Sequence, residues 1–361
     1  MTFDRNQPYN DLPALPPPVE LETKAVLKRA VAAHRALADL RGMAARIPNQ
    51  SILINGIVLQ EARLSSEIEN IVTTQDDLFR AAADGDGKAD AASKEVLRYR
   101  EALWTGFERL RNRPLTTNLF VELVRVIKNT DLDVRAVPGT KLANPASGEV
   151  VYTPPEGQAL LRDKLANLER FLYPDPPDDL DPLVRMAVMH YQFEAIHPFT
   201  DGNGRTGRIL NILWLVEQGL LDIPVLYLSR YILARRNDYY AGLRGVTEHG
   251  AWEPWVLYML DAVEQTARET CERVQRMLAL MESVRQEVQS RAPRIYSKDL
   301  IEVLFAHPYC KIQFLLDAQL AKRQTASDYL RTLADLGVLK AQKAGREVYY
   351  VNERLYQELV R

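Results

Sequence analysis

The sequence predicts a mainly α-helical protein with one small β-hairpin and a separate C-terminal module. Apolar residues recur at helical spacing along most of the chain. A short β-prone run at residues 150–153 is flanked by turn residues, which favours a hairpin. After residue 294 the pattern changes to helices followed by a two-stranded wing, which is typical of a winged helix-turn-helix module.

The expected elements follow in chain order. Prolines crowd residues 1–20, so this segment is expected to be an extended arm. Helical spacing then predicts helices over 19–46, 59–73, 94–106, 118–128, 158–171, 182–195, 207–218 and 251–289, with a short apolar segment at 52–57. Residues 82–92 have the composition of a flexible loop. In the last part, helices are expected over 298–306 and 325–336, then a turn at Ala344 and Gly345 and a strand over 348–351.

These elements divide the chain into four parts. Residues 1–110 hold the arm and the first helices, and 111–250 form the core with its hairpin at about 146–156. Residues 251–293 are a helical linker, and 294–361 are the winged-helix-like module.

Composition narrows the class of protein. The chain has 361 residues, 47% of them hydrophobic and 26% charged, as in ordinary proteins with a sizeable core. A net charge of −2 argues against a strongly basic nucleic-acid binder and a polybasic membrane anchor. Apolar runs stay below the roughly 20 residues of a membrane helix. Two cysteines without metal-ligand spacing and no secretory layout lead us to expect a cytoplasmic protein with no membrane partner.

The chemistry is concentrated in residues 197–208, HPFTDGNGRTGR, between two apolar helical stretches. Gly202, Asn203 and Gly204 tolerate positive φ, so their backbone N–H groups can converge on one concavity. That concavity opens at the start of the next helix, where free N–H groups and the helix dipole favour an anion.

The side chains of this stretch complete an anion-transfer site. Arg205 and Arg208 lie three residues apart, and guanidinium groups suit phosphate oxygens. Asp201 supplies a hard oxygen ligand for Mg²⁺, and His197 can take a proton near neutral pH. The stretch therefore indicates phosphoryl or nucleotidyl transfer.

Residues 197–208 resemble the signature of the Fic family, HPF-x-[DE]-GNGR-x-x-R, at every defined position. The resemblance implies a Fic-type helical bundle with a flap hairpin. It also implies transfer of AMP from ATP to a Ser, Thr or Tyr hydroxyl of a target protein, or of the chain itself, with release of pyrophosphate. Doc-type kinases carry Lys where this chain has Gly204, which favours AMP transfer over phosphate transfer.

The resemblance assigns roles by position. His197 would be the general base, Asp201 the Mg²⁺ ligand and Tyr240 the residue at the adenine. ATP phosphates would be held by Gly202, Asn203, Gly204, Arg205, Thr206, Gly207 and Arg208. The flap strand, which would pair with the target segment, comprises Val150, Val151, Tyr152 and Thr153.

A second motif indicates an internal brake. Ser65, Glu69 and Asn70 match the Fic inhibitory pattern [ST]-x-x-x-E-[GN]. A glutamate paired with Arg208 would remove the guanidinium that holds the γ-phosphate and leave ATP in an unproductive pose. In some relatives this glutamate also positions water to remove AMP, so de-AMPylation is an alternative activity.

Other interpretations stay open at this point. His190 lies seven residues before His197 and could share a metal site, although no third ligand has suitable spacing. The same core could transfer another nucleotidyl group, or it could sense nucleotide for a DNA-binding C-terminal module. That module has only a slight excess of basic residues, so target recognition or homodimer contact is favoured over DNA binding.

Overall fold

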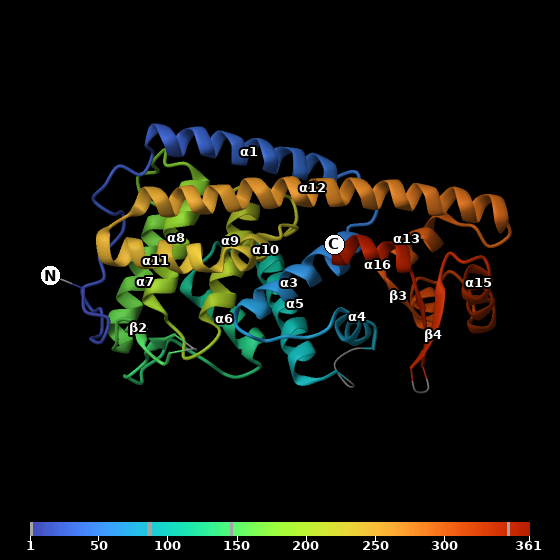
Figure 1. The fold of residues 1–361 in the computed structure, drawn as a ribbon, viewed down its shortest axis with the longest axis horizontal. Helices are drawn as coiled ribbons and strands as arrows, with labels where there is room; N and C mark the ends of the chain where they lie inside the picture. Colours follow the sequence, from blue (N-terminus) through green and yellow to red (C-terminus); the bar gives the residue numbers. More distant parts are fainter. Residues whose placement is uncertain (1–2, 85–88, 145–146, 345–346) are drawn as a thin grey trace.

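The computed structural model describes residues 3–84, 89–144, 147–344 and 347–361. It is mainly helical with two small sheets, which confirms the predicted fold class (Figure 1). Within these residues no helix combines the length and apolar character needed to span a membrane.

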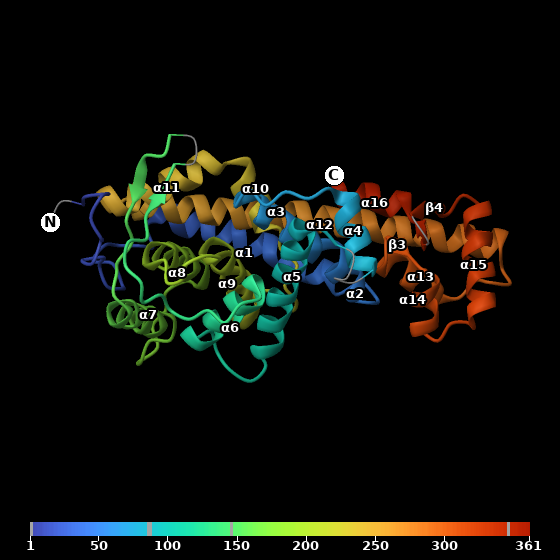
Figure 2. The same cartoon turned by 90° about the horizontal axis from the view of Figure 1, so that it is seen from below.

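The 40-residue helix α12 (Trp252–Arg291) is the central structural element of the molecule. Helix α1 (Lys24–Ala44) lies along it on one side (Figures 1 and 2). Their apolar faces meet, and Arg29 of α1 pairs with Asp261 of α12 at 2.7 Å. The expected linker is therefore a packed element that α1, α8 and α16 all contact.

The N-terminal helices lead toward the site. They are α2 (Ser51–Leu53), the π-helix η1 (Ile54–Val58), α3 (Leu59–Ile68), α4 (Gln75–Asp84), α5 (Ala91–Arg109) and α6 (Thr117–Lys128). The prediction of one helix over 59–73 is wrong at its end, because Asn70 has a left-handed φ of 61° and the Ile71 N–H bonds to the Ser66 carbonyl. Residues 82–84 belong to α4 rather than to a loop, and 85–88 lie outside the described residues.

The core bundle follows. It comprises α7 (Gln158–Leu172), α8 (Pro182–Ile196), α9 (Asn203–Glu217), α10 (Leu228–Ala234) and α11 (Arg236–His249). Helices α8 and α9 contact each other and are buried along most of their length. Helix α9 begins four residues earlier than predicted, because Gly202, at φ 82°, turns the chain directly into it.

The flap hairpin consists of β1 (Leu142–Ala143) and β2 (Val150–Tyr152) in antiparallel register. Thr153 lies just beyond the strand, and residues 145–146, where the expected flap begins, lie outside the described residues. The N-terminal arm packs on the flap, with the Tyr9 N–H donating to the Thr153 carbonyl at 3.0 Å.

The C-terminal module contains the two predicted helices, but its sheet has three strands among the described residues instead of the predicted two, and α14 and α16 were not predicted. Its elements are α13 (Lys298–Ala306), β3 (Tyr309–Cys310), α14 (Ile312–Asp317), α15 (Arg323–Asp335), β4 (Lys340–Ala344), β5 (Glu347–Val351) and α16 (Glu353–Val360). The antiparallel sheet has the order β3-β5-β4, and Gly345 of the predicted turn lies outside the described residues. The module packs against the N-terminal helices, where the Tyr309 hydroxyl donates to Asp76 at 2.6 Å.

Candidate functional site

The loop between α8 and α9 is held in one conformation by its own residues. His197 caps α8 with a left-handed φ of 49°, and its N–H bonds to the Phe193 carbonyl at 3.0 Å. The Asn203 side chain accepts the Phe199 N–H and donates to the Phe199 carbonyl, both at 2.8 Å. The side-chain amide of Asn203 therefore fixes the conformation of the loop. The backbone N–H of Asn203 lies at the start of α9.

The first turn of α9 is where the sequence places the anion site. Gly202 precedes it, and backbone N–H groups at a helix start have no intrahelical acceptor. A Cβ on Gly204 would overlap the Glu69 carboxylate, and one on Gly207 would overlap the Glu194 carboxylate. Both glycines thus allow a carboxylate to lie directly against α9. Thr206 is fully buried, and its hydroxyl has no hydrogen-bond partner among the described residues.

Arg208 brings the two sequence motifs together. Its side chain is 1% exposed, and its Nε donates to Ser65 Oγ at 2.8 Å. One terminal nitrogen donates to the Ser65 carbonyl at 2.9 Å and to Glu69 Oε1 at 2.8 Å. The pairing of Glu69 with Arg208 that the sequence predicts is therefore present in the structure.

Glu69 occupies the C-terminal end of α3. Its side chain is 37% exposed. Burial acts to raise the pKa of this carboxyl, but the charge and hydrogen bond of Arg208 outweigh it and hold the pKa below its ordinary value. Asn70 ends the helix in the left-handed conformation, and Arg236 of α11 donates to the Ile68 carbonyl at 2.7 Å. These two residues set where the Glu69 side chain leaves the helix.

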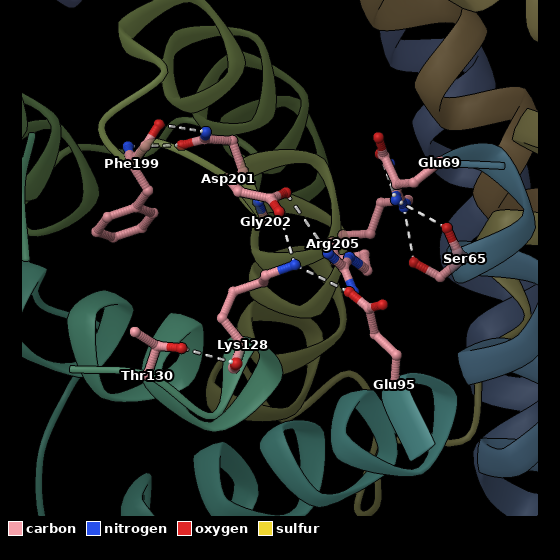
Figure 3. A network of polar contacts seen from close by, with 11 residues as sticks. Ser65, Glu69, Glu95, Lys128, Thr130, Phe199, Asp201, Gly202 and Arg205 are labelled. Carbon is pink, nitrogen blue, oxygen red and sulfur yellow. Dashed lines mark hydrogen bonds and ion pairs between the residues drawn. The ribbon is translucent and has the colours of Figure 1, made fainter. Parts of the chain in front are cut away.

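A second network surrounds Arg205 and Asp201 (Figure 3). Arg205 donates to Glu95 Oε1 of α5 at 2.6 Å and lies 3.7 Å from Asp201 Oδ1. Lys128 of α6 contacts both carboxylates, at 2.6 Å from Asp201 Oδ2 and 3.0 Å from Glu95 Oε1. Burial acts to raise the pKa of Asp201, but Lys128 and Arg205 hold that pKa below its ordinary value.

Asp201 fits a Mg²⁺ site of the kind completed by a substrate. Its side chain is 60% exposed at the mouth of the anion site. The described residues contain no group of three or more His, Cys, Asp or Glu side chains placed to hold a metal ion. Mg²⁺ commonly takes one or two carboxylates together with substrate phosphates and water, so a single carboxylate beside a phosphate site suits it.

His197 lies half-buried at the edge of this region, and its buried Nδ1 has no hydrogen-bond partner within the part of the chain that the structure describes. Arg135 donates from Nε to the His197 carbonyl at 2.8 Å, and its backbone N–H bonds to the Pro198 carbonyl at 2.9 Å. Burial, aided by the Arg135 charge, lowers the pKa of His197 to about 4. The imidazole is therefore neutral near pH 7 and able to accept a proton.

His190 is buried, and among the described residues it belongs to no group of three side chains that could hold a metal ion. Its Nε2 lies 2.9 Å from the Tyr239 hydroxyl, and its ring stacks on Trp255 with centroids 6.0 Å apart. His190 is thus a buried core residue of α8. Tyr240, the residue expected at the adenine, is 41% exposed on α11, and the Arg236 guanidinium lies 5.8 Å from its ring centre.

Sequence reasoning missed four residues of this region: Glu95, Lys128, Arg135 and Glu194. Glu95 and Lys128 lie on helices that the spacing predicts, but nothing in either helix marks them as site residues. Tertiary packing of α5 and α6 against α9 brings them there. Glu194 precedes His197 by one turn, so its helical position was the one available signal.

Three family models match the chain. They are "Fic/DOC family N-terminal" over residues 27–108, "Fic/DOC family" over 114–215, and "Protein adenylyltransferase SoFic-like, C-terminal domain" over 280–355. Together they span the helices that carry Glu69, the motif around His197 and the C-terminal module. The chain therefore contains Fic/DOC family domains.

Curated relatives match about a third of the chain. "Protein adenylyltransferase fic-1" of Caenorhabditis briggsae is 34% identical over 110 residues, which is 30% of this chain and 20% of that protein. "Protein adenylyltransferase Fic" of Nematostella vectensis is 32% identical over 115 residues, covering 32% of this chain and 25% of that one. The match thus spans about a fifth to a quarter of these relatives.

Solved structures share the fold. A Fic family protein from Desulfovibrio desulfuricans has a TM-score of 0.54 at 19% identity, and the match covers 93% of this chain and 98% of that one. Fic-1 from Caenorhabditis elegans, residues 134–508, has a TM-score of 0.52 at 19% identity, covering 69% of this chain and 73% of that one.

Proposed function

We propose that this chain is a protein adenylyltransferase that transfers AMP from ATP to a hydroxyl of a target protein or of itself. One observation carries the proposal: a neutral imidazole, a helix-start anion site, two buried arginines and an exposed carboxylate meet within one short loop and helix. The match to relatives named protein adenylyltransferases supports the same reaction.

The chemistry follows from what each group can do. The target hydroxyl oxygen attacks the α-phosphorus, the bond to the bridging oxygen breaks, and pyrophosphate leaves. His197 accepts the hydroxyl proton, because its lowered pKa of about 4 keeps it neutral. The α9 N–H groups stabilise charge on the phosphoryl oxygens. Mg²⁺ held by Asp201 and phosphate oxygens would neutralise charge on the leaving pyrophosphate.

We further propose that Glu69 restrains this reaction. Its carboxylate occupies the Arg208 guanidinium and places negative charge against the first turn of α9, beside Gly204. The Glu69 carboxylate repels a bound triphosphate, and the paired Arg208 guanidinium no longer donates to it. The α-phosphate is therefore not aligned for in-line attack. The same carboxylate could orient water for removal of AMP, so reversal of the modification by this site is a further part of the proposal.

The flap would present the acceptor hydroxyl. The Tyr152 hydroxyl donates to the Ala195 carbonyl at 2.8 Å, which ties β2 to the end of α8, two residues before His197. An extended target segment could add to β2 by backbone hydrogen bonds. A target hydroxyl held in this way would approach the imidazole.

Mass spectrometry tests the proposal. The wild-type, Glu69→Gly and His197→Ala proteins are incubated with Mg²⁺ and ATP, GTP, CTP or UTP in turn. We expect a mass gain of one adenylyl group with ATP, largest in Glu69→Gly and absent in His197→Ala. A gain with UTP instead would replace AMP by UMP as the transferred group. No gain on the chain or on proteins of a cell lysate would reject the transferase proposal.

A further inference from the structure

Lys128 is a charged residue of the site that the proposed chemistry does not use. It is the last residue of α6, and its ammonium bridges Asp201 Oδ2 at 2.6 Å and Glu95 Oε1 at 3.0 Å (Figure 3). Its side chain is 23% exposed. A Cβ on Gly202 would lie 3.5 Å from Lys128 Cγ, so the stem packs beside the motif loop.

This ammonium covers the oxygen that a metal ion would take. The other carboxylate oxygen of Asp201, Oδ1, already accepts the Gly202 N–H at 2.5 Å and faces Arg205 at 3.7 Å. Mg²⁺ binds carboxylate oxygens at about 2.1 Å. An ammonium hydrogen-bonded to the same oxygen would repel the dication at close range. Lys128 and a metal ion therefore compete for Asp201.

Glu95 provides a second place for the ammonium. It accepts from Arg205 at 2.6 Å and from Lys128 at 3.0 Å through the same oxygen, Oε1. A carboxylate has about four acceptor positions, so Glu95 can hold both cations when Lys128 leaves Asp201. Burial acts to raise the pKa of Glu95, but Arg205 and Lys128 hold that pKa below its ordinary value, which keeps it charged.

We propose that Lys128 is a positioning residue that bridges Asp201 and Glu95 and that leaves Asp201, while staying on Glu95, when a metal-bound nucleotide enters. Lys128 then raises the divalent-cation concentration that is needed for binding at Asp201, and Glu95 lowers that concentration. This inference rests on the proposed function, because it takes Asp201 to be the metal ligand.

Binding of Mn²⁺ to the full chain tests this exchange. The loss of the free Mn²⁺ signal in electron paramagnetic resonance is measured with saturating ADP, for wild type, Lys128→Met and Glu95→Gln. Methionine keeps the unbranched stem and removes the charge. We expect Lys128→Met to bind Mn²⁺ roughly three- to tenfold more tightly and Glu95→Gln to bind it more weakly by a similar factor.

The controls separate exchange from general damage. Lys128→Arg keeps the charge and should stay close to wild type, and Lys28→Met removes an exposed lysine of α1 and should change nothing. In these variants, either of two outcomes overturns the proposal: Mn²⁺ affinity unchanged in Lys128→Met, or shifts of the same sign in Lys128→Met and Glu95→Gln. If Lys128→Met melts early, Lys128→Gln carries the same expectation.

The result is independent of transfer. Opposite Mn²⁺ shifts in a chain that modifies no protein would reject the adenylyltransferase proposal and retain this exchange. Intact AMP transfer with Mn²⁺ affinity unchanged in the variants would retain the adenylyltransferase proposal and reject this exchange. Wild-type protein that binds Mn²⁺ no better than Asp201→Asn would overturn the exchange together with the metal role of Asp201.

Discussion

Arg205 and Arg208 lie about one turn apart on α9 and are both almost fully buried, yet their glutamate partners differ in kind. Glu69 stands at the end of a ten-residue helix, is 37% exposed, and forms an ion pair with Arg208. Glu95 lies within the 19-residue helix α5, is 22% exposed, and binds Arg205 and Lys128 together. The first carboxylate can leave by movement of a helix end, whereas the second belongs to the scaffold.

Helix α3 repeats this contrast along its own length. Near its start, Glu61 is 1% exposed and accepts the Ser229 N–H at 3.0 Å and the Tyr99 hydroxyl at 3.2 Å. Just before it, Asn55 donates to the Ala306 carbonyl of the C-terminal module at 3.0 Å. Its other end is held by polar contacts to Arg208 and Arg236. Opening is therefore expected at the Glu69 end, where fewer buried contacts must break.

The largest effect is expected from His197, whose role in the reaction is separate from the ion pairs of Arg205 and Arg208. In a Glu69→Gly background, His197→Ala should lower the rate of AMP transfer roughly 100- to 10,000-fold, because it removes the proton acceptor. Neither arginine pair involves the His197 side chain, so ATP affinity should stay within a factor of about three. The measurement is incorporation of α-phosphate-labelled ATP beside equilibrium nucleotide binding. Exposed His249→Ala serves as the control, and transfer unchanged in His197→Ala would contradict its role.

Glu95→Gln tests whether both pairs are brakes. If only Glu69 restrains the site, Glu95→Gln should not release activity. In the Glu69→Gly background at low Mg²⁺ it should lower transfer about tenfold, because Lys128 and Arg205 then both turn to Asp201. Labelling rates across a Mg²⁺ titration measure this, with exposed Glu101→Gln on the same helix as control. A rise in wild-type labelling on Glu95→Gln would make the two pairs equivalent.

Ser65→Ala should loosen the first pair partially. Its hydroxyl accepts from Arg208 Nε at 2.8 Å in a fully buried position. Its loss leaves that donor unpaired and should cost about 1–2 kcal/mol of unfolding free energy. Labelling should rise about threefold. Neighbouring Ser66 is equally buried, and its hydroxyl has no hydrogen-bond partner among the described residues, so Ser66→Ala should leave labelling unchanged. Urea unfolding and labelling of both variants check this.

The smallest expected effect is that of pH. The pKa of His197 is lowered to about 4, chiefly by burial and the Arg135 charge, with Glu69 and Asp201 opposing. The base is then available at all pH values above that range, so kcat/KM of Glu69→Gly should change little between about pH 6 and 8. The pKa of Glu69 is also lowered, so its pair with Arg208 holds above the ordinary glutamate range and is lost only below it. The ratio of variant to wild-type rates should therefore stay constant. A tenfold fall in kcat/KM per pH unit below about pH 7 would contradict the assigned pKa.

Whether a feature of the fold or site can be predicted from the sequence depends on how far apart in the chain its interacting residues lie. The loop from His197 to Gly204 is encoded locally, in residues that permit left-handed backbone and converging N–H groups. Glu69 was predicted to meet Arg208 through a motif. The ends of α3 and α9 were misjudged because Asn70 and Gly202 decide them through backbone conformation that periodicity does not report.

The remaining parts could not be predicted. Helices α10 and α11 have short or weakly apolar faces. Their formation therefore depends on packing against the rest of the bundle. Lys128 and Arg135 enter the site from segments about 60 to 70 residues before the motif. Nothing near them in the chain distinguishes them from ordinary surface charges.

The central claim is that Glu69 restrains an adenylyltransferase by holding Arg208. Its most direct test is the initial rate at which wild type, Glu69→Gly and Glu67→Gly incorporate label from ATP tagged at the α-phosphate. Glu67→Gly places the same helix-weakening residue two positions earlier, where the side chain pairs with Arg63 at 2.7 Å instead. We expect Glu69→Gly to incorporate label about 100-fold faster than wild type, and Glu67→Gly to stay close to wild type. Equal rates in wild type and Glu69→Gly would contradict the account.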